Sequence, residues 1–334
     1  MGLACRAYES NLTEWPLAEQ SGWRQAVAKQ WPGALLWDAP LAGFTTLKVG
    51  GPAAAVAMPA STAELVSLLA LLRSHDVPWR VIGRGSNLLA SDRGYEGMVI
   101  VLDRRFGAIG REANDEGKSI VRVEAGCGLA PLLQWCAAQG LAGLEFLAGI
   151  PGSVGGALAM NAGAWGEEVA GRLSAVELLD AGGVLRRVPR QELRFSYRHF
   201  ELAPETVIVA GLFALPTGSG REIEEKMAAH VAARKAKQPK GVANAGSFFK
   251  NPPGDAAGRL IEQAGLKGTT VGGAMVSPVH ANFLVNTGNA TAAELVALMR
   301  LVQDEVAARF GVRLEPEVHL LGDFAVNPEE RRRG

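Results

Sequence analysis

Apolar residues recur every three or four positions in residues 61–78, which indicates a helix with one buried face. The residues of that face are Leu65, Leu68, Leu69 and Leu72. Ser61 and Glu64 have the spacing of a capping box, so the helix should begin there. The short apolar runs at 79–83 and 97–103 are typical of strands. This part of the chain is predicted to alternate helix and strand.

The middle of the chain has more strand patterns. Apolar and polar residues alternate in 119–126, and residues 174–188 read as two strands around an Ala-Gly-Gly turn. A further strand is predicted at 206–215. Residues 129–140 form a predicted helix, which Gly140 should end because glycine is common just after a helix.

The last third is predicted to contain three helices and two strands. The helices are expected at 221–238, 256–265 and 291–311, and the strands at 281–286 and 313–322. Thr291 and Glu294 form a second capping box. The composition shift at Pro216–Gly220 marks the best domain boundary, near residue 217. Residues 1–37 carry four tryptophans without a clear period, so we expect an N-terminal extension. The pattern as a whole indicates an α+β protein.

Composition excludes several classes of function. The chain has 334 residues, and its 34 Lys and Arg balance its 34 Asp and Glu, so nothing draws it to nucleic acid or to an anionic membrane. Three cysteines without a CxxC pair fit a reducing compartment. No signal peptide and no long apolar run is present, so we expect a cytoplasmic protein. The sequence gives no oligomeric state, and a monomer is the default expectation.

Two glycine-rich stretches are candidates for binding an anion. Residues 143–166 contain seven glycines among hydroxyl and amide side chains, so backbone N–H groups could approach a phosphate closely. Residues 83–87, GRGSN, follow a predicted strand and could do the same. Neither matches a Walker A loop or a Rossmann fingerprint. From these residues alone, a loop that merely turns the chain explains both stretches as well.

Residues 244–252, NAGSFFKNP, raise a sharper question. Ser247 is close to Lys250 and Asn251, so it could be a reactive hydroxyl beside groups that hold an anion. It could equally belong to a turn whose two phenylalanines enter the core. The residues alone do not decide between these interpretations.

Other polar clusters have ordinary explanations beside functional ones. An arginine of 194–200, RFSYRHF, could bind a carboxylate, or the segment could be a surface strand. Glu315 and Glu317 have the spacing of one strand face. Cations at the end of the helix 221–238 suit its dipole, although two that flank Pro239 could do more. These cations are Arg234, Lys235, Lys237 and Lys240, of which Lys237 and Lys240 flank the proline. The five histidines show no metal-ligand spacing, and we predict no metal site.

Taken together, eight stretches resemble the UDP-N-acetylenolpyruvoylglucosamine reductase (UDP-N-acetylmuramate dehydrogenase) family, and they follow its order. They are TTLKVGGPA (45–53), GRGSNLL (83–89), the glycine-rich segment (143–166), FSYR (195–198), GSFFKNP (246–252), AGRLIEQAG (257–265), HANFLVN (280–286) and LEPEV (314–318). The resemblance implies an FAD enzyme that uses NADPH to reduce a UDP-sugar enolpyruvyl ether in peptidoglycan precursor synthesis. It also implies a two-lobed FAD-binding domain of the vanillyl-alcohol-oxidase type and a C-terminal α+β substrate domain.

The resemblance implies a role for individual residues. Arg198, Ser247 and Glu317 would be catalytic, with Ser247 as the proton donor. Substrate would be held by Tyr197, Lys237, Lys250 and Asn251. FAD would be bound by Gly83, Arg84, Gly85, Ser86, Asn87, Gly149, Ile150, Pro151, Gly152, Ser153, Gly155, Gly156, Asn161, Gly163 and Ala164.

The implied domains are an extension at 1–37, one FAD lobe at 38–103, a second at 104–217 and a substrate domain at 218–313. The final segment, 314–334, would return as a strand, and we assign it to the second lobe.

The chain also departs from parts of the family's pattern. Only 48 residues separate Arg198 from Ser247, too few for the loop whose tyrosine closes over the substrate in one form of the family. The chain therefore resembles the compact form, and another feature must cover its substrate. Ala159 and Trp165 replace the larger or basic residue and the tyrosine that are usual there. Two rivals stay open from sequence: an oxidase on the same flavin fold, and a UDP-sugar-binding protein without turnover.

Overall fold

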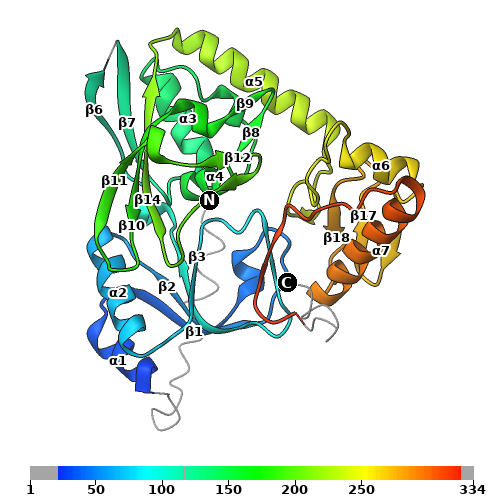
Figure 1. The fold of residues 1–334 in the computed structure, drawn as a ribbon, viewed down its shortest axis with the longest axis horizontal. Coiled ribbons are helices and arrows are strands. Elements are labelled where there is room, and N and C mark those ends of the chain that lie inside the picture. Colours follow the sequence, from blue (N-terminus) through cyan, green and yellow to red (C-terminus); the bar gives the residue numbers. More distant parts are fainter. Residues whose placement is uncertain (1–21, 116, 325–334) are drawn as a thin grey trace.

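A computed structural model describes residues 22–115 and 117–324 of the protein, which form three lobes (Figure 1). The first lobe is a four-stranded sheet in the order β1-β2-β5-β3, in which β1 is antiparallel to β2 and the others are parallel. Two helices pack on it. Its elements are α1 (Gly22–Gln30), β1 (Ala34–Pro40), η2 (Leu41–Phe44), β2 (Pro52–Met58), α2 (Thr62–Ser74), β3 (Trp79–Ile82) and β5 (Tyr95–Val101).

The helix predicted at 61–78 is confirmed as α2, and its four leucines are buried. One half of the expected capping box forms, because the Ser61 hydroxyl accepts the Glu64 N–H at 3.2 Å. The other half does not, since the Glu64 carboxylate accepts the N–H of Ala60 rather than that of Ser61. The Glu64 side chain therefore bonds the residue before the N-cap and not the N-cap itself.

Ordered structure begins before residue 37. The helix α1 packs against α2, and β1 pairs with β2 along its length, so residue 37 lies inside a strand. Trp31 is buried and its indole N–H donates to the Glu64 carbonyl at 2.9 Å. The pattern was hidden because β1 is an edge strand with half-buried residues, which leaves no clear alternation. Residues 1–21, including Trp15, lie outside the described residues.

The second lobe is an antiparallel sheet in the order β11-β10-β14-β7-β6, on which α3 and α4 pack. Its core is continuous with that of the first lobe, because side chains of both belong to one buried cluster. The strands and helices predicted in 119–140 and 174–215 are confirmed here. The elements are η3 (Arg104–Phe106), β6 (Ile109–Asp115), β7 (Lys118–Glu124), α3 (Leu129–Ala138), η4 (Glu145–Leu147), α4 (Val154–Ala159), η5 (Val169–Arg172), β10 (Leu173–Leu179), β11 (Leu185–Pro189), η6 (Arg190–Glu192) and β14 (Val207–Leu215).

The third lobe is a small antiparallel sheet in the order β15-β18-β17-β16, packed on two helices. The capping box predicted at Thr291 and Glu294 is present at the start of α7. The core of this lobe also takes in Leu47, Val49 and Leu89 from the first lobe. The elements are β15 (Ala243–Asn244), α6 (Ala257–Gln263), β16 (Thr270–Val271), β17 (Ala274–Val276), β18 (Leu284–Asn286) and α7 (Ala292–Phe310).

Helix α5 (Gly220–Lys237) follows the expected boundary near residue 217 and runs from the second lobe toward the third (Figure 1). Ile223 is buried, and Met227 and Val231 pack on the shared core of the first two lobes. Most of α5 therefore lies on the second lobe, although the sequence grouped it with the substrate domain.

The strand predicted at 313–322 is wrong over most of its length. Only β19 (His319–Leu321) is extended, and it pairs in parallel with β4 (Leu88–Ala90). It thus joins a segment of the first lobe, whereas the sequence grouped it with the second. Residues 314–318 meet a loop instead of a strand and form one isolated bridge, between Pro316 and Phe249. Pro316 also lacks the N–H that a longer ladder would use.

Candidate active site

Arg198 lies in a two-residue turn between the short strands β12 (Phe195–Ser196) and β13 (His199–Phe200). Its φ is +55°, an unusual value for a residue with a side chain. The rings of Phe195 and Phe200 stack at 4.1 Å and hold the hairpin together. The Arg198 side chain forms two hydrogen bonds outside the hairpin. Its Nε donates to Glu317 Oε1 at 3.0 Å, and its Nη2 donates to the Gly163 carbonyl at 3.2 Å.

Tyr197 precedes this arginine and is largely exposed. The guanidinium carbon of Arg198 lies 4.9 Å from the centre of the Tyr197 ring, a cation–π contact. The phenol is therefore at the surface beside a fixed positive charge, where it can contact an entering ligand.

Ser247 is placed by a turn that its neighbours define. The Asn244 carboxamide accepts the Gly246 N–H at 3.0 Å, and Gly246 has φ +76°, which favours glycine. The two following residues, Phe248 and Phe249, are fully buried and pack in the core of the third lobe. Among the described residues, the Ser247 hydroxyl has no hydrogen-bond partner. It is half-buried and free to serve a ligand.

Main-chain bonds join this turn to the segment that carries Glu317. The Glu317 N–H donates to the Phe248 carbonyl at 2.8 Å, and the Lys250 N–H donates to the Glu315 carbonyl at 2.9 Å. Ser247 is thus next in sequence to a residue bonded to Glu317, and Glu317 is bonded to Arg198. The structure brings these three predicted catalytic residues together from three distant parts of the chain.

The two glutamates of LEPEV occupy different environments, contrary to the expectation of one strand face. The Glu315 side chain is 69% exposed and pairs with Lys250, whereas the Glu317 side chain is only 16% exposed. Burial raises the pKa of the Glu317 carboxyl, and the positive charges of Arg198 and Lys250 offset only part of that rise. Glu317 is therefore easier to protonate than an ordinary glutamate.

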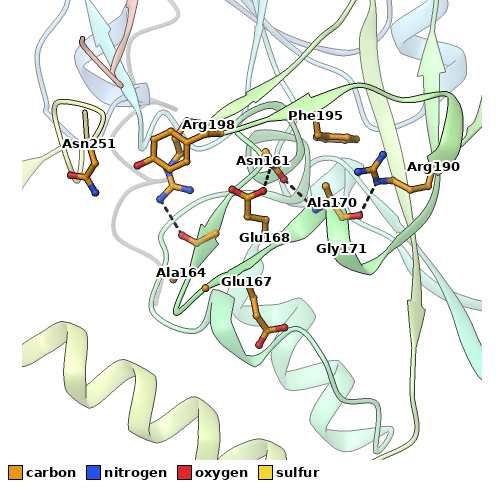
Figure 2. Close-up of a pocket in the computed structure, with 13 residues that line it drawn as sticks. Asn161, Ala164, Glu167, Glu168, Ala170, Gly171, Arg190, Phe195, Arg198 and Asn251 are labelled. Carbon is orange, nitrogen blue, oxygen red and sulfur yellow. Dashed lines mark hydrogen bonds between the residues drawn. The ribbon is translucent and has the colours of Figure 1, made fainter. Parts of the chain in front are cut away.

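A cavity of about 600 Å³ opens beside Arg198. Figure 2 shows Arg198 between Asn251 on one side and Asn161 and Glu168 on the other. Ser247 and Glu317 are not among its lining residues, although Asn251 of the Ser247 loop is. The lining is Asn161, Gly163, Ala164, Gly166, Glu167, Glu168, Ala170, Gly171, Arg190, Phe195, Tyr197, Arg198 and Asn251.

The turn GRGSN offers a cradle for a phosphate. Within the described part of the chain, the backbone N–H groups of residues 84–87 have no acceptor, and successive free N–H groups of this kind bind anions. Gly85 has φ +60°, and a Cβ there would lie 1.9 Å from the Phe44 carbonyl oxygen. Ser86 and Asn87 hold the turn in place, since their side chains donate to the carbonyls of Pro151 and Glu317.

The second glycine-rich segment meets this turn. A Cβ on Gly83 would lie 2.2 Å from Ser153 Oγ, so the two loops are in direct contact. The first N–H groups of α4 already have partners within the protein, including Ser153 Oγ for Gly156. Gly152 and Ser153 themselves have no partner for their N–H groups among the described residues, and these two remain available to a ligand.

The side chains of Asn161 and Asn251, both predicted to bind a ligand, form hydrogen bonds within the protein. The Asn161 carboxamide is buried, and it bonds Glu168, the Ser196 carbonyl and the Ala170 N–H. It fixes the Arg198 hairpin, so both of its polar atoms already have partners within the protein. The Asn251 carboxamide accepts the N–H of Ala257 at the start of α6, although it also lines the cavity.

Lys237 is exposed at the end of α5, where its charge acts on His280 of the third lobe. No bond joins it to the Arg198 group in the described residues. Sequence reasoning missed Asn282, although it lies in the quoted stretch HANFLVN. This buried carboxamide accepts the Phe249 N–H and donates to the Phe249 carbonyl, and so clamps the loop that carries Ser247.

Comparisons with known proteins agree with this geometry. Residues 53–189 match a family described as FAD binding domain, and residues 238–321 match the C-terminal domain of UDP-N-acetylenolpyruvoylglucosamine reductase. The chain is 44% identical to the UDP-N-acetylenolpyruvoylglucosamine reductase of Syntrophus aciditrophicus, over 87% of this chain and 93% of the relative. It is 47% identical to that of Trichlorobacter lovleyi, over 86% and 93%.

The chain belongs to the UDP-N-acetylenolpyruvoylglucosamine reductase family. The crystal structure of the Thermus caldophilus reductase superposes with a TM-score of 0.72 at 40% identity, covering 86% of this chain and 98% of that one. The expected family and the expected fold, an FAD-binding domain followed by an α+β domain, are confirmed.

The residues present fit FAD. The free N–H groups of residues 84–87 suit its pyrophosphate, and the glycines of both loops leave room for close approach. A second cavity of about 170 Å³ adjoins Gly83 and Ser153, and its largely apolar lining includes Val81 and Ile82. An apolar slot beside a phosphate cradle matches a dinucleotide with an aromatic base. Ala159 lines this slot, so the small residue there widens it.

Trp165, the other departure from the family's pattern, has φ +59° and is 50% exposed. It occupies the turn between β8 (Gly163–Ala164) and β9 (Glu167–Glu168), and its ring stacks on His230 of α5 at 5.0 Å. Trp165 thereby connects the β8–β9 hairpin to α5.

Proposed function

We propose that the chain reduces the enolpyruvyl double bond of UDP-N-acetylenolpyruvoylglucosamine to give UDP-N-acetylmuramate, a peptidoglycan precursor. Family membership supports the substrate and the step, and the match to the FAD-binding domain supports a flavin reaction. The observation that carries the proposal is the junction of Arg198, Glu317 and the Ser247 turn beside the phosphate cradle.

When bound between the two glycine-rich loops, FAD reduced by NADPH would supply the hydride. Once the terminal carbon of the enolpyruvyl group has taken it, negative charge is left on the neighbouring carbon and its carboxylate. Arg198 is a permanent cation with a planar donor fork, so it stabilises that charge where it develops. Glu317, when protonated, donates a hydrogen bond to the same carboxylate instead of repelling it.

Ser247 gives its proton to the carbon next to the carboxylate, which completes the addition of two hydrogens across the double bond. Its hydroxyl has no partner among the described residues that would hold the proton elsewhere. Lys250 and Asn251 position the loop and the substrate. Tyr197 contacts the substrate at the surface, and Lys237 reaches it from α5. These roles belong to the proposal.

The cell biology follows from the reaction. No helix among the described residues has the length and apolarity needed to cross a membrane. We place the enzyme in the cytoplasm, where its nucleotide-linked substrates are made, and its product supports cell-wall synthesis, cell shape and division. The proposed partners are FAD, NADPH and the UDP-sugar.

Activity measurements separate this function from its rivals. The purified protein should be yellow, with flavin absorbance, and should consume NADPH only when the enolpyruvyl UDP-sugar is present. A colourless protein that binds the UDP-sugar would indicate a binding module. Consumption of oxygen with an alcohol as the reductant would indicate an oxidase. Either result would overturn the proposal.

The raised pKa of Glu317 predicts the pH dependence of the second half-reaction. The protonated carboxyl is the active form, so the rate of substrate reduction should fall as pH rises through the Glu317 pKa. In Glu317→Gln, which is neutral at all pH values, this decline should disappear. Stopped-flow flavin absorbance would measure it, with the NADPH half-reaction as the internal control. A variant that keeps the wild-type decline would contradict the role of Glu317.

A further inference from the structure

Helix α5 presses two side chains of one face against the glycine-rich segment of the second lobe. His230 and Arg234 are one helical turn apart, so they lie on the same face. His230 stacks on Trp165, and Arg234 Nε donates to the Ala148 carbonyl at 3.1 Å. A Cβ on Gly149 would lie 2.9 Å from Arg234 Cδ, so the arginine side chain lies closely against that glycine. Arg234 is therefore fixed rather than free in solvent.

Arg234 lies on the face of α5 that contacts the glycine-rich segment to which Arg198 is bonded. The Gly163 carbonyl accepts a hydrogen bond from Arg198, and Trp165 follows two residues later in the β8–β9 hairpin. His230 of α5 stacks on Trp165, so α5 packs against this hairpin. Burial and the positive charge of Arg198 both lower the pKa of Arg234, which agrees with two cations close together. In the described part of the chain no carboxylate pairs with Arg234, and its two Nη groups have no acceptor.

Two neighbouring guanidiniums repel each other unless an anion joins them. Glu317 forms an ion pair with Arg198 and not with Arg234. Burial raises the pKa of this same carboxyl, which favours its neutral form. With Glu317 neutral, two cations would face the substrate. Hydride addition turns the carboxylate of the enolpyruvyl group into an enolate. The group then carries close to two negative charges. Two guanidiniums balance that charge, whereas Arg198 alone would leave one negative charge unpaired.

We propose that Arg234 binds the carboxylate of the enolpyruvyl group together with Arg198. The inference rests on the proposed function and adds a residue that contacts the substrate. The two Nη groups of Arg234 form a planar edge that suits a carboxylate. Arg234, rather than the exposed Lys237, is then the cation of α5 at the reacting centre.

The Kd values of two ligands show whether Arg234 contacts the carboxylate or acts in another way. UDP-N-acetylenolpyruvoylglucosamine carries the carboxylate, and UDP-N-acetylglucosamine shares its uridine, diphosphate and sugar but lacks the enolpyruvyl group. Calorimetric titration of the FAD-loaded protein without NADPH gives Kd for both, since no turnover occurs without the reductant. The variants are Arg234→Gln and Arg234→Lys. The matched control is Lys235→Gln, which removes the adjacent, exposed charge of the same helix.

Arg234→Gln should weaken the enolpyruvyl ligand by about 10- to 100-fold, as expected for a lost charged hydrogen bond, and change the other ligand by less than about twofold. Arg234→Lys keeps the charge and should give an intermediate loss, and it carries the test if Arg234→Gln does not fold. Lys235→Gln should change neither Kd. Equal weakening of both ligands, or of neither, would overturn the inference.

The wild-type protein shows whether the proposed function itself fails. If it does not prefer the enolpyruvyl ligand and does not reduce it, the function is wrong. If it shows both behaviours and Arg234→Gln keeps the same preference, only the role of Arg234 is wrong.

Discussion

Replacing Ser247 by alanine is expected to slow reduction of the enolpyruvyl sugar by about 10²- to 10⁴-fold, the usual contribution of a general acid. Reduction of the flavin by NADPH should keep its wild-type rate, because no proton is added to the sugar in that half. Stopped-flow absorbance of the flavin measures the two halves separately. The loop itself should survive, since Asn282 and the buried phenylalanines hold it without the hydroxyl.

Ser247→Cys is the matched variant, because a thiol can still donate a proton. It should recover part of the rate that alanine loses. If the alanine variant completes both halves at wild-type rates, Ser247 is only a turn residue and another group supplies the proton.

Arg198→Met is the second change with a large expected effect. It removes the cation at the developing charge and leaves Glu317 without the guanidinium that binds it. Loss of one such group costs about 10²- to 10³-fold in turnover in comparable anion sites. We expect that loss in the half-reaction with the sugar, measured as flavin reoxidation under anaerobic conditions.

The control is Arg194→Met, in the same short segment. The Arg194 side chain is 83% exposed and lies 3.9 Å from Glu201, so its loss should change either half-reaction by less than about twofold, as is usual for surface ion pairs. The rate of Arg198→Lys should lie between those of the wild type and Arg198→Met, since lysine keeps the charge but not the planar donor fork. Wild-type turnover in Arg198→Met would remove Arg198 from the mechanism.

Local patterns predicted the elements that bury one face. The leucines of α2 and both halves of the α7 cap follow from spacing alone, because those contacts lie within one helix. The edge strand β1 and the segment 314–318 were misread, since a long-range partner decides whether such residues are extended. The pattern around Pro316 suggested a ladder, but its actual partner is a loop.

The site shows the same division. Motif resemblance indicated Arg198, Ser247 and Glu317 as candidates, and the structure joins the first and last across 119 positions of sequence. It did not distinguish Arg234 from Lys237, because both end one cationic helix. Only the packing of α5 shows that Arg234 meets the Ala148 carbonyl while Lys237 is exposed. The occupied carboxamide of Asn161 was likewise invisible, since its partners include Glu168 and a backbone carbonyl 35 positions away.

Glu317 lies between α7 and β19, so the group of Arg198, Ser247 and Glu317 is completed only after α7 has been synthesised and β19 can pair with β4. Both glycine-rich loops and the Arg198 hairpin leave the ribosome well before Glu317, which then docks through the Asn87 carboxamide. A transcript cut short after α7 would encode the phosphate cradle but not the buried carboxyl. Such a product would also lack β19, so premature termination removes both the carboxyl that pairs with Arg198 and the strand that joins this end of the chain to the first lobe.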